Sequence, residues 1–141
     1  MHKLTALDLT AFENRKSSDF LETWQSIQWA VVEDNVLYVQ HKGYGYQGYY
    51  DGKTAYITAI SLEDYRILWT SSPLTAGGII FEMIDNSIYC GFGKHIFVLD
   101  KFTGKRVQSI SIKEGIGYLI AKEDTLYVYS EHYWDIYDIL K

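Results

Sequence analysis

Few side chains in this sequence combine the residue types and the spacing that metal or thiol chemistry requires. The single cysteine, Cys90, has no second thiol with which to share a metal ion, and we expect it to be an inert, buried side chain. No two histidines stand four residues apart; they are His2, His41, His95 and His132. The sequence therefore predicts no zinc site and no metal–thiolate cluster.

Motifs of common enzyme classes are also missing from the sequence. Gly43-Tyr44-Gly45 leads into further loop rather than into a helix, so it does not match the glycine-rich loops that bind phosphates. There is no Gly-x-Ser-x-Gly elbow for a nucleophilic serine. Paired acids such as Glu63-Asp64 and Glu123-Asp124 fall at expected turns, where solvated carboxylates are common. We expect no catalytic residues, no cofactor and no enzymatic activity.

Aromatic recognition is the chemistry that the segment between His41 and Thr54 indicates. Four tyrosines stand among four glycines there, and this mixture joins large, rigid contact surfaces to an adaptable backbone, as in antibody loops. The alternative is a long surface hairpin without a role, since surface loops tolerate insertions. The predicted partner-binding residues in this loop are Tyr44, Tyr46, Tyr49, Tyr50 and Asp51.

A second aromatic and acidic cluster lies near the carboxyl end, between Tyr127 and Asp138. Aromatic residues alternate with acids, so one strand face could present acids and rings to a cationic surface. The alternative is an ordinary half-buried strand, and for Trp134 and Tyr137 we expect core packing. The predicted partner-binding residues here are Glu131, His132, Tyr133 and Asp135.

The composition favours strands as the elements that carry these residues. Hydrophobic residues make up 48% of the 141 residues and aromatic residues 16%, and aromatic side chains suit pleated, half-buried surfaces. The formal net charge of −5 argues against a nucleic-acid partner, because binding a phosphate backbone needs clustered Lys and Arg. The first residues lack the apolar run of a secretory signal, and no stretch is apolar for long enough to span a membrane. We expect a cytoplasmic protein with no membrane partner.

Repeats in the sequence indicate how the strands are organised. A turn followed by an apolar strand recurs around Tyr38, Tyr89 and Tyr127, at intervals of 51 and 38 residues. A second strand pattern ends at Asp8, Ser61, Asp100 and Asp138, and the last interval is again 38. A unit of this length with several strands fits one β-propeller blade. The first unit is longer because it holds the tyrosine-rich loop.

The repeats predict an all-β fold, a partial (half) β-propeller of about three four-stranded antiparallel blades in one domain over residues 1–141. The predicted units are 27–70, 76–112 and 116–140, and strands within 3–24 (at 3–9 and 20–24) complete a blade. Within the middle unit we expect strands at 77–84, 87–92, 95–100 and 106–112. A turn containing Gly104 joins the last two of them.

The segment His95-Ile96-Phe97-Val98-Leu99-Asp100-Lys101-Phe102-Thr103-Gly104-Lys105 resembles the core of the pyrroloquinoline-quinone-type β-propeller repeat, Tyr-Ala-Leu-Asp-x-x-Thr-Gly-Lys. Tyr56 to Trp69 resembles the same motif with its Thr-Gly lost and its closing Trp kept, and Ser71-Ser72-Pro73 also fits the pattern. The resemblance covers most of residues 27–140 and implies a scaffold or binding surface. It does not imply the quinone cofactor, which needs a full, larger propeller.

The chain holds material for about three blades, whereas closed propellers typically have four to eight. We therefore expect an open arc covered by a partner, or a ring completed by dimerisation. The segment Asp19–Trp24 is a candidate for the missing outer strand of the last blade, within one chain or from a second copy.

These features together favour a non-enzymatic protein-binding module. The small, acidic, tyrosine-rich profile is similar to that of bacterial toxin-immunity proteins, which implies an inhibitor that neutralises a basic toxin, such as a nuclease, by occluding it. The alternatives are a scaffold subunit that homodimerises into a full propeller and a ligand-binding or enzymatic propeller.

Overall fold

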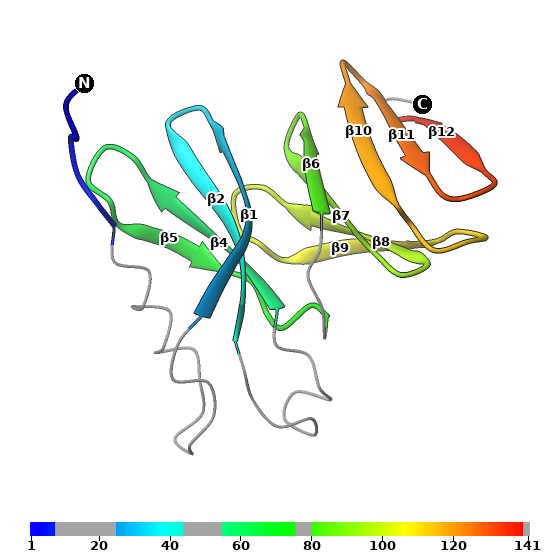
Figure 1. Cartoon of the computed structure of the whole chain (residues 1–141), viewed down its shortest axis with the longest axis horizontal. Helices are drawn as coiled ribbons and strands as arrows, with labels where there is room; N and C mark the ends of the chain where they lie inside the picture. The colour runs from blue at the N-terminus through cyan, green and yellow to red at the C-terminus, as the bar shows by residue number, and fades with distance from the viewer. Residues whose placement is uncertain (8–24, 44–54, 76–79, 140–141) are drawn as a thin grey trace.

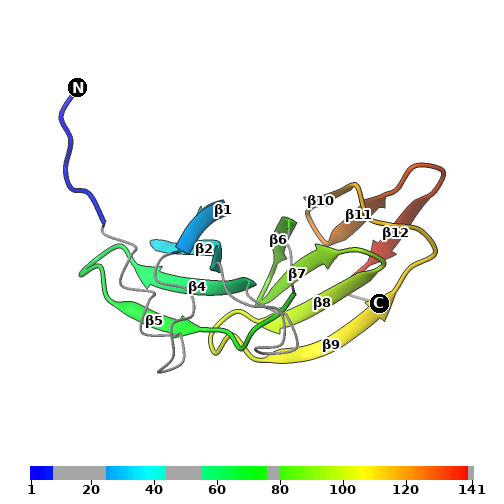
Figure 2. The same ribbon diagram turned by 60° about the horizontal axis from the view of Figure 1, so that its bottom comes forward.

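The computed structural model describes residues 1–7, 25–43, 55–75 and 80–139, and these residues form strands and no helix. The described part accordingly holds no helix long and apolar enough to cross a membrane. Three antiparallel sheets follow one another along the chain and fan out side by side (Figures 1 and 2). The predicted all-β, partial-propeller fold is confirmed.

The strands within each sheet are neighbours in the order in which they occur in the sequence. Blade 1 consists of β1 (Gln25–Glu33), β2 (Val36–Gly43), β4 (Ala55–Ser61) and β5 (Ile67–Thr70). Blade 2 consists of β6 (Ile80–Ile84), β7 (Ser87–Phe92), β8 (His95–Asp100) and β9 (Arg106–Ser111). Blade 3 has three strands in the described residues, β10 (Tyr118–Lys122), β11 (Thr125–Tyr129) and β12 (Trp134–Asp138). The two middle strands of blade 2 have the predicted bounds.

The predicted amino-terminal strand at 3–9 is wrong over its described part. Residues 1–7 have no regular secondary structure, and the side chain of Leu4 is 93% exposed. No described strand pairs with this segment, and an extended segment without a neighbour makes no ladder hydrogen bonds. Leu7 packs against Val39 and Ile60 on the outer side of blade 1. The predicted strand at 20–24 lies outside the described residues.

The first two strands of every blade are joined by a two-residue turn with an acidic first residue. Asp34, Asp85 and Glu123 have φ angles of 50°, 51° and 56°. Hairpin turns of two residues need a positive φ because their twist must match the twist of the strands. The same local geometry therefore starts all three blades.

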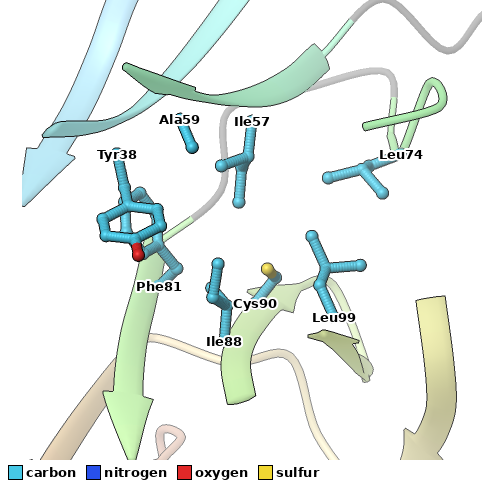
Figure 3. Packing of buried hydrophobic residues seen from close by; sticks show 8 residues of the cluster. All are labelled: Tyr38, Ile57, Ala59, Leu74, Phe81, Ile88, Cys90 and Leu99. Atoms are coloured by element: carbon cyan, nitrogen blue, oxygen red, sulfur yellow. The ribbon is translucent and has the colours of Figure 1, made fainter. Parts of the chain in front are cut away.

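Blade 2 packs on both of its neighbours, and each junction has its own apolar cluster. Tyr38, Ile57 and Ala59 of blade 1, together with Leu74 from the segment after β5, meet Phe81, Ile88, Cys90 and Leu99 of blade 2 (Figure 3). A second cluster joins blade 2 to blade 3 through Ile84, Tyr89, Ile96, Val98, Leu119, Leu126 and Val128. The alternating residues of one strand supply opposite junctions, since Leu99 belongs to the first cluster and Val98 to the second.

Trp69 fastens blade 1 to the last turn of blade 2. Its indole Nε1 donates a hydrogen bond of 3.0 Å to the backbone oxygen of Lys101. Its ring lies against Gly104, where an added Cβ would stand 2.3 Å from Trp69 Cε3. Gly104 has a φ of 74°, which also favours glycine. The Thr-Gly of the repeat motif therefore makes room for the tryptophan of the preceding blade.

The turn between Asp100 and Lys105 is held by hydrogen bonds of its own residues. The Asp100 carboxylate accepts from the N–H groups of Phe102 (2.8 Å) and Thr103 (2.9 Å). The Gly104 N–H donates to the backbone carbonyl oxygen of Asp100 at 2.8 Å. The Thr103 hydroxyl accepts a hydrogen bond of 3.2 Å from the Lys105 N–H. These bonds position Gly104 beneath the Trp69 ring.

Replacing Gly104→Ala is expected to lower the free energy of unfolding by about 2 to 4 kcal/mol, because the new Cβ collides with Trp69 and the residue keeps a positive φ. Gly93→Ala is the matched control, since Gly93 has a φ of 58° and nothing within 4 Å of an added Cβ. It should cost only about 1 kcal/mol. Urea unfolding measures both, and equal losses would contradict the proposed clamp.

Candidate protein-binding surface

Strict alternation of side chains divides blade 3 into a buried and an exposed face. Leu119, Leu126 and Val128 point towards blade 2 and are 0 to 2% exposed. The residues that alternate with them point the other way, as the period of a strand requires. Together with the β12 residues that pair with them, they form two cross-strand rows, Tyr118–Tyr129–Trp134 and Ile120–Tyr127–Ile136. We call these six residues the third-blade face.

The third-blade face is apolar, aromatic and largely open to solvent. Trp134 is 55% exposed and Ile136 59%, while Tyr118 and Ile120 are also exposed and the two β11 tyrosines are half-buried. The Trp134 ring stacks on Tyr129 with centroids 4.9 Å apart and an interplanar angle of 22°. It also lies 5.9 Å from the Tyr127 ring. Such cross-strand aromatic contacts hold the rings in place and leave their outer surfaces available.

Two residues of blade 2 that are equivalent to residues of the third-blade face are buried between two blades. The 38-residue repeat makes Trp134 the equivalent of Ile96 and Ile136 the equivalent of Val98. In blade 2 these positions lie against blade 3 and are 0% and 3% exposed. The third-blade face thus has the character of an inter-blade surface, but no described residue covers it.

Three of the sequence-predicted residues, Glu131, His132 and Tyr133, lie in the turn between β11 and β12, at one end of the third-blade face. The His132 N–H donates to Glu114 Oε1 and its Nδ1 lies on Oε2, both at 2.9 Å. These hydrogen bonds hold the pKa of Glu114 below its ordinary value, and the bond to the His132 side chain has the larger effect. The turn is thus a polar rim tied to the chain segment before β10.

The other residues discussed for this cluster, Asp135, Trp134 and Tyr137, have different surroundings. Asp135 does not share a face with Trp134 and Ile136, because it pairs with Val128 and points to the opposite side of the sheet. Its role in partner binding stays a prediction. The expected core packing of Trp134 is wrong, since the blade that would bury it is not among the described residues. Tyr137 does pack against the cluster between blades 2 and 3, as expected.

The predicted loop residues Tyr44, Tyr46, Tyr49, Tyr50 and Asp51 lie outside the described residues. The flanking strands are described, and β2 and β4 stay in register as far as Lys42 and Ala55. None of the six residues of the third-blade face was among the predicted partner-binding residues, although four of them lie within the predicted cluster between Tyr127 and Asp138. The signal was present in the 38-residue spacing, which relates Ile136 to an inter-blade residue of blade 2.

A concave region lies between blades 1 and 2, beside the Trp69 clamp. It has a volume of about 390 Å³ and is lined by Asp34, Val36, Tyr38, Ala59, Leu68, Trp69, Asn86, Lys101 and Phe102. The Lys101 ammonium pairs with Glu33 and, at 3.4 Å, with Asp34. Burial disfavours the charged lysine, but the hydrogen bond and charge of Glu33 outweigh it and raise its pKa. The cation of this cleft therefore serves to join the two blades.

The described residues contain no cluster of three His, Cys, Asp or Glu side chains that could hold a metal ion. Cys90 is completely buried in the cluster between blades 1 and 2 (Figure 3). Burial raises the pKa of its thiol well above the ordinary value, which disfavours the reactive thiolate. The side chain of Cys90 thus contributes to packing.

The third blade and the segment that precedes it are rich in acidic residues. Residues 113–139 carry six acids against two lysines, a formal charge of −4 out of −5 for the whole chain. The acids are Glu114, Glu123, Asp124, Glu131, Asp135 and Asp138. An aromatic surface within an acidic blade has the residue types that protein interfaces use for anchoring and for charge complementarity.

The arrangement of the blades is similar to that of several solved structures. The computationally designed Ika8 protein superimposes with a TM-score of 0.58 at 14% identity, over 80% of this chain and 33% of that one. A europium-containing methanol dehydrogenase gives 0.52 at 16% identity, over 82% and 25% of the two chains. BamB from Moraxella catarrhalis gives 0.51 at 16% identity, over 72% and 40%.

The last two of these proteins are β-propellers, so the likeness supports the propeller-like fold, and at such identities it shows the fold alone. The chain spans between a quarter and two fifths of the length of the three proteins. No family model matches the chain, and no curated protein matches it in sequence.

A matched pair of substitutions tests whether the third-blade face is uncovered. Val98→Thr should lower the free energy of unfolding by about 1 to 3 kcal/mol, because it buries a hydroxyl between blades 2 and 3. Ile136→Thr, at the equivalent position of blade 3, should change it by less than about 0.5 kcal/mol. Thermal or urea unfolding provides the comparison. A comparable loss at both positions would mean that Ile136 is buried in solution.

Proposed function

We propose that this chain is a non-enzymatic protein-binding module that acts in the cytoplasm and binds its partner through the third-blade face. The observation that supports this function is the exposure of Trp134 and Ile136 at positions whose blade 2 equivalents are buried between blades. Contiguous apolar surface of this kind is typical of protein-interaction sites. Tyr and Trp are also the residue types that most often carry binding energy at interfaces.

The partner that fits this surface best is a basic protein domain. The formal charge of −4 over residues 113–139 would attract Lys and Arg side chains while the rings of the third-blade face fill apolar pockets. Within this class we propose an immunity or inhibitor role, in which the chain neutralises a basic toxin such as a nuclease by covering its active surface. The small, acidic, tyrosine-rich profile supports this role.

The proposed mechanism is occlusion, with no chemical step by this chain. Opposite charges would steer the two proteins together, and the association rate should fall steeply as salt screens them. The aromatic anchors would then set the lifetime of the complex, since most affinity differences lie in dissociation.

Affinity capture from the source cells, with the bound proteins identified by mass spectrometry, tests this function. The wild-type chain should retain a basic protein, and the purified protein should lose its own activity when the chain is added. Trp134→Ala combined with Ile136→Ala should weaken binding by at least about tenfold, which corresponds to the loss of two anchors. Val107→Ala is the control, because Val107 is 62% exposed but lies on blade 2.

Two results would contradict the proposal. One is equal retention of the partner by the double variant and the wild type. The other is a specific partner that is acidic and binds equally well at low and high salt.

A homodimeric scaffold is the second candidate, because the third-blade face has the character of a surface that packs on another blade. Two copies could then supply six blades to one ring. Sedimentation velocity decides between the candidates. A stable dimer without any partner, dissociated by Ile136→Asp, would favour the scaffold, whereas a monomer at all concentrations would exclude it.

A further inference from the structure

Blade 3 differs from its neighbours at the outer edge of its third strand. In blade 1, β4 pairs with β2 on one side and β5 on the other, and in blade 2, β8 lies likewise between β7 and β9. Among the described residues, β12 pairs with β11 alone. Its other edge lies beside the third-blade face, at the end of the fan of sheets (Figure 1).

The hydrogen bonds at both ends of the β11–β12 pair show which way the backbone of β12 points. The Ser130 N–H donates to the backbone carbonyl oxygen of Tyr133, and the Ile139 N–H donates to the backbone carbonyl oxygen of Asp124. Alternate residues of an antiparallel strand bond to the same neighbour. The N–H and C=O groups of Trp134 and Ile136 are therefore directed away from β11, towards the outer edge.

Blade 2 shows what normally meets those groups. The equivalents of Trp134 and Ile136 are Ile96 and Val98, which pair with Ile110 and Gln108 of β9. The Ile112 N–H donates to the Lys94 oxygen at 2.8 Å, which fixes the same alternation along β9. The edge of β12 thus offers the donors and acceptors that a fourth strand requires.

We propose that the partner completes blade 3 by strand addition, placing an extended, basic segment antiparallel to β12 along Trp134 and Ile136. This inference rests on the proposed protein-binding function and specifies how the partner is held. Main-chain hydrogen bonds supply affinity in this mode of recognition, and alternate side chains supply specificity. On the third-blade side, the added strand would lay its side chains beside Trp134 and Ile136.

The chemistry of the added strand follows from the two outer strands that the chain already has. Arg66 directly precedes β5, and Lys105 directly precedes β9, whose first residue is Arg106, so positive charge stands at the start of both strands. Blade 3 lies within the segment of charge −4. Opposite Trp134, the blade 2 pattern places an apolar residue, as Ile110 stands opposite Ile96. The segment should therefore join a basic residue to an apolar one about four positions later.

The same charges argue against a second β12 as the occupant. Two copies of this edge would bring Asp135 and Asp138 of both chains together, and like charges across a strand pair are destabilising. Acids on an edge strand also protect it from aggregation. The charge of blade 3 thus selects a basic strand from a different protein.

A peptide with the sequence of residues 104–112, the chain's own β9 segment, is the probe for this edge. Fluorescence anisotropy of the labelled peptide measures its binding to the whole protein. N-methylation at the positions of Gln108 and Ile110 removes the two N–H groups that face β12 and should weaken binding at least about tenfold. N-methylation at Val107 and Ser109 is the matched control, because those groups face away, and binding should stay within about twofold.

The same assay tests substitutions of charged residues in the peptide and of Ile136 in β12 of the protein. Replacing Lys105→Glu and Arg106→Glu in the peptide should weaken binding, and the difference should shrink at high salt. In the protein, Ile136→Pro removes the edge N–H, whereas Ile136→Thr removes the apolar side chain and keeps the donor. Proline is tolerated at a strand edge, so Ile136→Pro should fold and should lose the peptide more completely than Ile136→Thr.

Hydrogen exchange tests the edge in the unaltered protein. The amides of Trp134 and Ile136 should exchange rapidly in the free protein and slowly with the peptide bound. Protection in the free protein would mean that another part of the chain, such as residues 19–24, or a second copy already fills the edge, and the proposal would be wrong. Absence of peptide binding, or equal weakening by both pairs of N-methyl groups, would also overturn it.

The outcomes separate this inference from the proposed function. If a captured basic partner binds Ile136→Pro as tightly as Ile136→Thr, the third-blade face is the binding site and strand addition is wrong. If the peptide behaves as expected but the chain retains no basic protein, the edge accepts strands and the proposed function is wrong.

Discussion

A sheet that is apolar on both faces needs a packing partner on each side, and the burial of blades 2 and 3 depends on this requirement. Blade 2 meets it, because Leu99 lies in the cluster shared with blade 1 and Val98 in the cluster shared with blade 3. Blade 3 has the same alternation but only one described neighbour. Trp134 and Ile136 are therefore exposed where Ile96 and Val98 are buried. The candidate binding surface is a direct consequence of the repeat.

The two junctions are built by different means although the blades share one pattern. Trp69 and Gly104 fasten blade 1 to blade 2. The position of Trp69 is occupied in blade 2 by Gln108, which pairs with Val98 as Trp69 pairs with Ala59, so blade 2 has no tryptophan to clamp onto blade 3. Blade 3 instead packs Leu119 and Ile116 against Gly91, whose added Cβ would lie 3.1 Å and 3.2 Å from their Cδ1 atoms. Sequence divergence has thus kept the blade geometry and changed how blades are joined.

The proposed recognition mode uses two properties that coincide at β12. The strand has a free edge within the described residues, and it lies in the most acidic part of the chain. A free edge alone would be an aggregation hazard, and acidic charge alone would be a solubility device. Together they favour a strand of opposite charge. The aromatic rows beside the edge provide the apolar contact that backbone hydrogen bonds lack.

Local pattern by itself determined the blade repeat, the turns between the first two strands of each blade, and the strands of blade 2. The bounds of Ser87–Phe92 and His95–Asp100 were predictable because alternation and turn residues act over a few positions. The exposure of Trp134 was not predictable in this way, because it depends on which blade lies alongside β12. The sequence showed the aromatic and acidic residues of the candidate site. Only the tertiary structure decided which of them share a surface, since burial depends on neighbours that local spacing does not specify.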